Sequence, residues 1–155
     1  ELNDQYSFAE LCDLAAKADF SSRVDVNDAS FLAPENMIAA VQEMCRKTGQ
    51  AVPETPGEIA SCIYQSLADS YCETVQEIEE MSGRTYSRIH IVGGGSNAVY
   101  LNELTAKATG KEVYAGPGEA TAIGNLAAQM LQDGVYSSVE EVRTAIGVSF
   151  DMKKY

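Results

Sequence analysis

The sequence predicts an α/β protein that is predominantly helical and carries a small parallel sheet. Three observations support this prediction. A long amphipathic pattern runs through the middle of the chain, a short β-branched run ends at three glycines in "RIHIVGGG", and a second strand-like run, "KEVYA", follows one helix later. Because crossovers between such units are right-handed, the strands expected at about 87–92 and 111–115 should be parallel.

The central helix has the clearest start signal. In "ETPGEIA", Thr55 is placed to cap the helix, Pro56 takes the first helical position, and Glu58 completes a capping box. Apolar residues then recur every three or four positions as far as Ile78. Gly83 can end the helix in a left-handed cap, so a helix is expected over 56–82.

The first 50 residues are expected to form a helical insertion of the same domain as 55–155, which holds the long helix and the two strand–helix units. Ser7 and Glu10 form a second capping box, which predicts a helix over about 8–18. Pro34 suits the first turn of a further helix, and Gly49 suits its end.

Three more helices are expected after the first strand. The first runs from about Asn97 to Thr109, with Gly110 as its stop. The next is opened by Pro117 and ends before Gly134, and the motif "SSVEEV" starts a last one.

Composition narrows the classes of partner. The 155 residues suit one domain, and the net charge of −12 with a pI of about 4.4 argues against nucleic acid and against an anionic membrane surface. No apolar run approaches the roughly 18 residues that suggest a membrane span. The chain opens without an initiator Met, and we expect it to be an excised piece of a longer protein.

Metal chemistry and nucleophilic chemistry have little support. The four cysteines form neither a CxxC pair nor a zinc spacing, and we expect reduced thiols in a cytoplasmic protein. His90, the single histidine, lies inside a strand and is expected to be structural. The sequence predicts no catalytic residue and no metal site.

The turn after the first strand is the candidate binding site. It comprises Gly93, Gly94, Gly95, Ser96 and Asn97. Glycines admit positive φ and close approach of a ligand, and ligands of parallel sheets lie beyond the carboxyl ends of the strands. The motif by itself fits a nucleotide site and a tight structural turn equally well. A second run of small residues, "AGPGEATAIGN", follows the second strand.

A family resemblance extends over nearly the whole chain. "IHIVGGGSNAVYLNELTAKATGKEVYAGPGEATAIGN" and, upstream, "CRKTGQAVPETPGEIASCIYQSLADSY" resemble the carboxyl-terminal domain of FGGY carbohydrate kinases, most closely the rhamnulokinase branch. The resemblance implies part of an actin-like, ribonuclease-H-like ATPase domain. It also implies an enzyme that transfers the γ-phosphoryl group of ATP, with Mg²⁺, to O1 of L-rhamnulose. Gly94 would lie against the nucleotide.

The same resemblance implies that the catalytic aspartate, a phosphate loop and most sugar contacts lie upstream of residue 1. The chain alone is therefore expected to be inactive. Two positions depart from the family: Asn97-Ala98 stands where Gln-Asn is usual, and Gly118 where Val is frequent.

Two other functions stay open at this point: an actin-fold nucleotide sensor or regulator without phosphoryl transfer, and a structural oligomerisation domain. A homodimer is also expected, joined through the open edge of the 87–92 strand or through an uncovered helix face around Ile59, Ile63 and Leu67.

Overall fold

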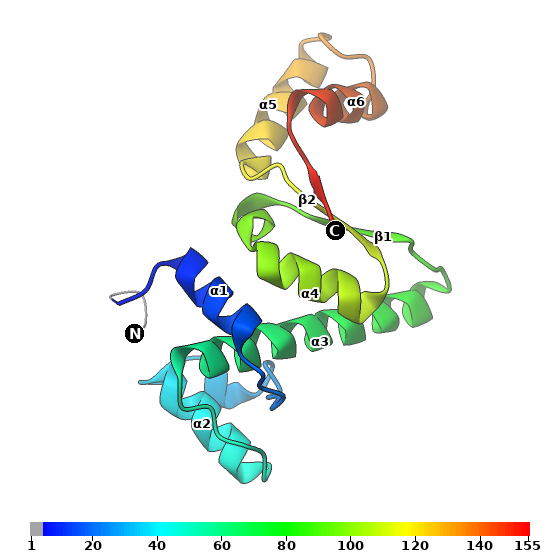
Figure 1. Cartoon of the computed structure of the whole chain (residues 1–155). Coiled ribbons are helices and arrows are strands. Elements are labelled where there is room, and N and C mark those ends of the chain that lie inside the picture. The colour runs from blue at the N-terminus through cyan, green and yellow to red at the C-terminus, as the bar shows by residue number, and fades with distance from the viewer. Residues whose placement is uncertain (1–4) are drawn as a thin grey trace. The chain divides into compact units, whose positions relative to one another are not determined.

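The computed structural model describes residues 5–155 and divides into two compact units. The first unit extends to Gly83 and the second begins at Arg84. Figure 1 shows a helical first unit and a second unit in which helices and short strands alternate. The predicted class, α/β with mostly helical content, is confirmed.

Three α-helices and one short 3₁₀ helix build the first unit. They are α1 (Phe8–Lys17), η1 (Ala29–Phe31), α2 (Met37–Lys47) and α3 (Pro56–Ser82). Both predicted capping boxes are present, at Ser7 of α1 and at Thr55 of α3. Gly83 ends α3 at φ +63°, which confirms the predicted left-handed cap.

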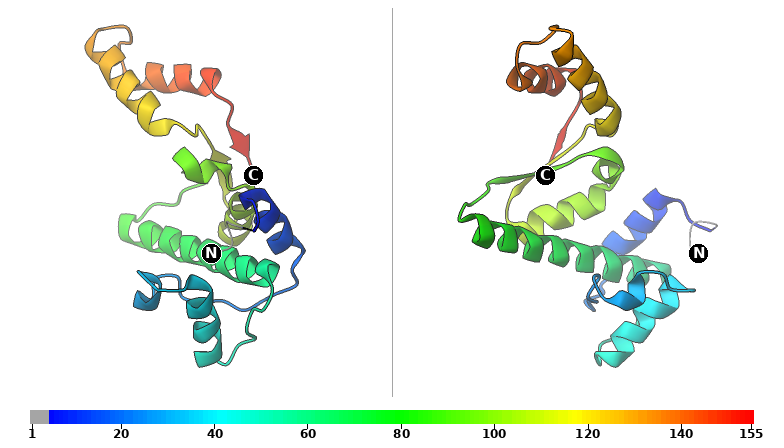
Figure 2. Two further views of the ribbon diagram at one scale, coloured as in Figure 1. Left: turned by 90° about the vertical axis from the view of Figure 1, so that its left-hand side faces the viewer. Right: turned by 180° about the vertical axis from the view of Figure 1, so that it is seen from behind.

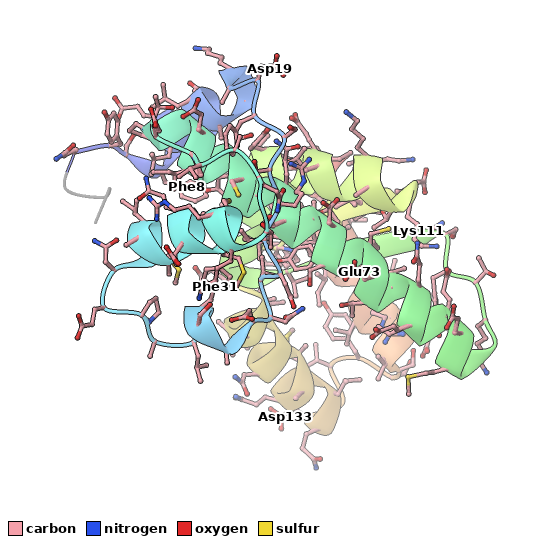
Figure 3. All side chains as sticks on the ribbon, turned by 90° about the horizontal axis from the view of Figure 1, so that it is seen from below. Phe8, Asp19, Phe31, Glu73, Lys111 and Asp133 are labelled. Atoms are coloured by element: carbon pink, nitrogen blue, oxygen red, sulfur yellow. The ribbon has the colours of Figure 1, made fainter. Side chains whose placement is uncertain are left out.

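Close packing of α1 on α3 depends on a glycine. A Cβ atom at Gly57 would lie 2.9 Å from the carbonyl oxygen of Leu14, so any side chain there would push the two helices apart. On the other side of α3, a core forms around Val41 and Cys45 of α2 and Cys62 of α3. Figure 2 shows α2 beside the first half of α3, and Figure 3 marks Phe31, which packs against this core.

Two expectations for the first unit are wrong. The second helix begins at Met37 and not at Pro34, because the Asn36 side chain accepts a hydrogen bond from the backbone N–H of Ala39 and caps the helix there. The apolar face of α3 around Ile59, Ile63 and Leu67 is not open as expected, since Ile59 is buried and Ile63 and Leu67 are half-buried. The exposed apolar residues of α3 lie in its second half, at Tyr71, Ile78 and Met81.

The second unit is built on a small sheet. Its elements are β1 (Arg88–Ile91), η2 (Gly93–Asn97), α4 (Val99–Thr109), β2 (Glu112–Ala115), α5 (Ala120–Gln132), α6 (Val139–Ser149) and β3 (Lys153–Lys154). The predicted parallel pairing of β1 with β2 is confirmed. Within residues 5–155 the strand order is β1-β2-β3, and β3 pairs antiparallel with β2. The sheet is therefore mixed, because a strand that the sequence did not predict joins it.

Two helices of this unit start later than predicted. Residues 93–97 form the 3₁₀ helix η2, so α4 begins at Val99. Pro117 precedes α5 and belongs to a turn, because its carbonyl oxygen accepts the N–H of Gly93. The Gly116–Pro117 peptide bond is cis.

The two faces of the sheet differ in chemistry. Val113 and Ala115 are buried, and α4 packs on β2. On the other face, His90 stacks on Tyr114 with ring centroids 5.3 Å apart, which agrees with a structural role for this histidine. Lys154 forms an ion pair with Glu112 and thereby lowers the pKa of that carboxyl group.

No helix of residues 5–155 combines the length and the apolar character needed to cross a membrane. The division into a helical region at 1–50 and a remainder at 55–155 refers to the layout of a complete kinase domain and stays a prediction.

Candidate functional site

The turn after β1 is a single turn of 3₁₀ helix entered through Gly93. Val92 is still extended, and Gly93 has φ +71°, a conformation that side-chain-bearing residues rarely adopt. The Ser96 hydroxyl donates to the carbonyl oxygen of Gly93 at 2.7 Å, and the N–H of Ala98 donates to the carbonyl oxygen of Gly95 at 3.1 Å. These bonds close the turn on itself before α4 begins.

The structure joins this turn to the turn after β2. The N–H of Gly93 donates to the carbonyl oxygen of Pro117 at 3.0 Å, and the N–H of Gly116 donates to the carbonyl oxygen of Ile91 at 2.9 Å. The carboxyl ends of parallel neighbours meet at one edge of a sheet, which is where ligands of open α/β sheets bind. The two glycine-rich runs found in the sequence therefore form one continuous surface.

Gly93 and Gly118 lie where the two turns meet. A Cβ atom at Gly118 would lie 4.0 Å from both the Ser96 Oγ atom and the Asn97 Nδ2 atom, and one at Gly93 would lie 3.9 Å from the carbonyl oxygen of Gly118. A valine at position 118 would extend further and contact Ser96 and Asn97. The two departures from the family pattern thus face each other, since the small Gly118 leaves room beside Asn97.

Gly94 differs from Gly93 because nothing in the chain requires a glycine there. It is exposed, its φ is not positive, and no atom lies within 4 Å of a Cβ built on it. Gly95 and Asn97 are also exposed, whereas Ser96 is buried. The open face of the turn is thus centred on main-chain atoms of Gly94 and Gly95, with the Asn97 side chain beside them.

One residue of this region was missed by sequence reasoning. Asn102 of α4 is 1% exposed, and its Nδ2 atom donates to the carbonyl oxygen of Ser96 at 3.1 Å. The sequence pattern of 97–109 places Leu101, Leu104, Thr105 and Ala108 on one helical face, and it includes Thr105 but not Asn102, the other most buried side chain of α4. Asn102 and Thr105 are three residues apart and therefore lie on one face of the helix. This spacing is the sequence signal that could have identified Asn102 as buried.

The described residues offer little for metal or nucleophilic chemistry. Within residues 5–155, no group of three His, Cys, Asp or Glu side chains is placed to hold a metal ion. Within residues 5–155 the four cysteines form no disulfide, and burial raises the pKa of Cys62 to about 12. In the two turns, 93–97 and 116–119, Glu119 is the single carboxylate.

Comparison with known proteins decides the family. Residues 2–132 match the model of the FGGY family of carbohydrate kinases, C-terminal domain. The chain belongs to the FGGY family of carbohydrate kinases. The ribonuclease-H-like, actin-like fold of that C-terminal domain is consistent with the helices and small sheet of residues 5–155.

The similar curated proteins are named rhamnulokinases. The chain is 48% identical to the rhamnulokinase of Halalkalibacterium halodurans, over 99% of the chain and 33% of that protein. It is 47% identical to that of Ligilactobacillus salivarius and 42% identical to that of Bacillus subtilis, in each case over 100% of the chain and 32% of the relative. This FGGY domain therefore spans about a third of the length of the relatives that it matches.

Proposed function

We propose that the chain is the nucleotide-binding part of an ATP-dependent sugar kinase. The parent enzyme would convert ATP and L-rhamnulose to ADP and L-rhamnulose 1-phosphate, as the names of the similar proteins suggest. The observation that carries the proposal is the pair of linked turns at the carboxyl ends of β1 and β2, with open space over Gly94.

In this proposal the turn contributes shape and main-chain polarity. Residues 93–97 would contact the adenosine part of ATP, with Gly94 against it and the Asn97 amide within reach of a polar group. Glycines at 93, 94 and 95 allow the ligand to approach the backbone. When bound, Mg²⁺ would neutralise charge on the transferred phosphoryl group. Its ligands and the catalytic base would come from the rest of the enzyme.

The identity of the sugar substrate is tested with the full-length kinase that carries this chain. A coupled ADP-release assay with ATP, Mg²⁺ and a series of ketoses should give the highest kcat/KM for L-rhamnulose, and the product should carry its phosphate on O1. A higher kcat/KM for another ketose would leave the family in place but overturn the substrate. ATP-independent binding of the sugar, with no ADP released, would favour a sensor.

The 155-residue chain alone is proposed to be inactive. Its two turns hold a single carboxylate, Glu119, and within residues 5–155 no group of three His, Cys, Asp or Glu side chains is placed to hold a metal ion. The same assay applied to the purified chain should show no ADP release above a mock purification. Turnover above that background would mean that the catalytic groups lie within these residues.

We also propose a cytoplasmic enzyme and a homodimer of the isolated chain. Four cysteines that form no disulfide within residues 5–155, two of them buried, fit a reducing compartment. Within residues 5–155, β1 is an edge strand whose outer side has no strand neighbour, and such edges pair with other chains. Light scattering at micromolar concentration should give twice the 16.7 kDa mass of one chain. A mass of one chain would rule out the dimer.

A further inference from the structure

Asn102 carries a buried polar atom that the fold leaves unsatisfied. The side chain is 1% exposed, and its Oδ1 atom has no hydrogen-bond partner among the described residues. Leaving a buried acceptor without a partner costs free energy, and such atoms in folded proteins call for an explanation. An apolar side chain of similar size at this position would avoid that cost.

The orientation of this amide is fixed by the atom that it faces. The Nδ2 atom of Asn102 lies 3.1 Å from the carbonyl oxygen of Ser96. A carbonyl oxygen accepts hydrogen bonds only, so the NH₂ group must face it and Oδ1 must point elsewhere. The amide therefore donates a hydrogen bond to the glycine turn, and its oxygen stays unsatisfied as a consequence.

We infer that Asn102 is a positioning residue for nucleotide binding, which it serves by holding the shape of residues 93–97. This inference rests on the function proposed above. Asn102 does not touch the open face of the turn. Its side-chain amide donates a hydrogen bond to the carbonyl oxygen of Ser96. The Ser96 hydroxyl in turn donates to the carbonyl oxygen of Gly93 at 2.7 Å.

Together these hydrogen bonds fix the direction of three carbonyl groups of the turn. The carbonyl oxygens of Gly93, Gly95 and Ser96 accept hydrogen bonds from Ser96, Ala98 and Asn102. Carbonyl oxygens held in this way are directed toward the protein and away from an arriving ligand. Without the Asn102 amide, the Ser96 carbonyl is free to rotate outward, where its partial negative charge would oppose the hydroxyl and phosphate oxygens of a nucleotide.

The test compares two buried polar residues of one helix in the full-length kinase. Asn102→Leu removes the amide and keeps its branched shape, although leucine is larger than asparagine. Thr105→Val is the matched control, because Thr105 is also 1% exposed and its hydroxyl donates to the carbonyl oxygen of Leu101, not to the turn. We expect Asn102→Leu to raise KM for ATP at least fivefold with KM for the sugar within twofold. Thr105→Val should leave both constants within twofold.

A second readout does not depend on activity. Amide hydrogen exchange over residues 93–97, measured without nucleotide, should accelerate at least fivefold in Asn102→Leu and stay within twofold in Thr105→Val. If Asn102→Leu does not fold, Asn102→Ala is measured instead, because alanine favours the helix and cannot overpack the site. If neither variant folds while Thr105→Val does, Asn102 is a framework residue and the inference is wrong.

Two further results would overturn the inference. One is a KM for ATP within twofold of wild type in folded Asn102→Leu, and the other is an equal rise in Thr105→Val. A parallel Gly94→Val variant separates this failure from failure of the proposed function. If KM for ATP rises in Gly94→Val but not in Asn102→Leu, only the positioning role of Asn102 is refuted. If KM for ATP does not rise in Gly94→Val, the proposed nucleotide site is refuted.

Discussion

Gly94 offers the sharpest test of the proposed nucleotide site. The fold tolerates a side chain at this position, whereas the proposed contact with the nucleotide does not. A Cβ atom at this position meets no atom within 4 Å, and the backbone does not have positive φ. Surface substitutions without such constraints change the free energy of unfolding by no more than about 0.5 kcal/mol. Gly94→Ala should therefore leave thermal unfolding nearly unchanged.

The effect on ATP should be larger and should grow with side-chain size. If the nucleotide contacts the backbone of Gly94, a methyl group intrudes on it and the valine side chain fills its place. We expect Gly94→Val to raise KM for ATP at least tenfold, which corresponds to about 1.4 kcal/mol of binding free energy. Gly94→Ala should have a smaller effect, and KM for the sugar should stay within twofold for both variants.

Initial rates of the full-length kinase at varied ATP and saturating sugar measure this effect, with unfolding curves as the check on stability. Gly147→Ala is the matched control, since a Cβ atom there also meets open space and the backbone also lacks positive φ, but the residue lies in α6. If Gly94→Val keeps KM for ATP within twofold, the substitution changes the binding free energy of ATP by less than about 0.4 kcal/mol. The turn would then be structural only.

Three further predictions concern the first unit. Gly57→Ala should destabilise the chain by about 1–3 kcal/mol, seen as a lower melting temperature, because its Cβ atom would lie 2.9 Å from the Leu14 carbonyl oxygen; an unchanged melting temperature would mean that α1 shifts freely on α3. Cys62 should resist a thiol reagent at pH 8 until denaturant is added, since burial raises its pKa to about 12 and keeps it protonated; rapid labelling of the folded chain would contradict this. The N–H groups of Thr55 and Glu54 lower the pKa of Glu58, so its contribution to stability is present above the unfolded pKa of about 4.5 and is lost as pH falls below it. Glu58→Gln should flatten this acid dependence of urea unfolding, and an unchanged pH profile would refute the cap's role.

The sequence alone determined the features that depend on neighbours within one turn. The capping boxes at Ser7 and Thr55, the left-handed cap at Gly83 and the helix stop at Gly110 were predicted correctly, because a cap is formed by residues three or four positions apart. The parallel pairing of β1 and β2 followed from the handedness of crossovers. The family resemblance was also carried by local strings, and the comparisons confirmed it.

Tertiary structure decided what depends on residues far apart in the chain. The two-residue strand β3 has no pattern of its own and exists because it pairs with β2. Pro117 could start a helix by local preference, but its carbonyl oxygen is instead used by Gly93 in the neighbouring turn. The role of Asn102 was hidden because its burial is decided by packing. A polar residue in a helix is expected to face solvent until packing buries it, and the partner that it then needs is chosen by the fold, here the Ser96 carbonyl oxygen six residues before it.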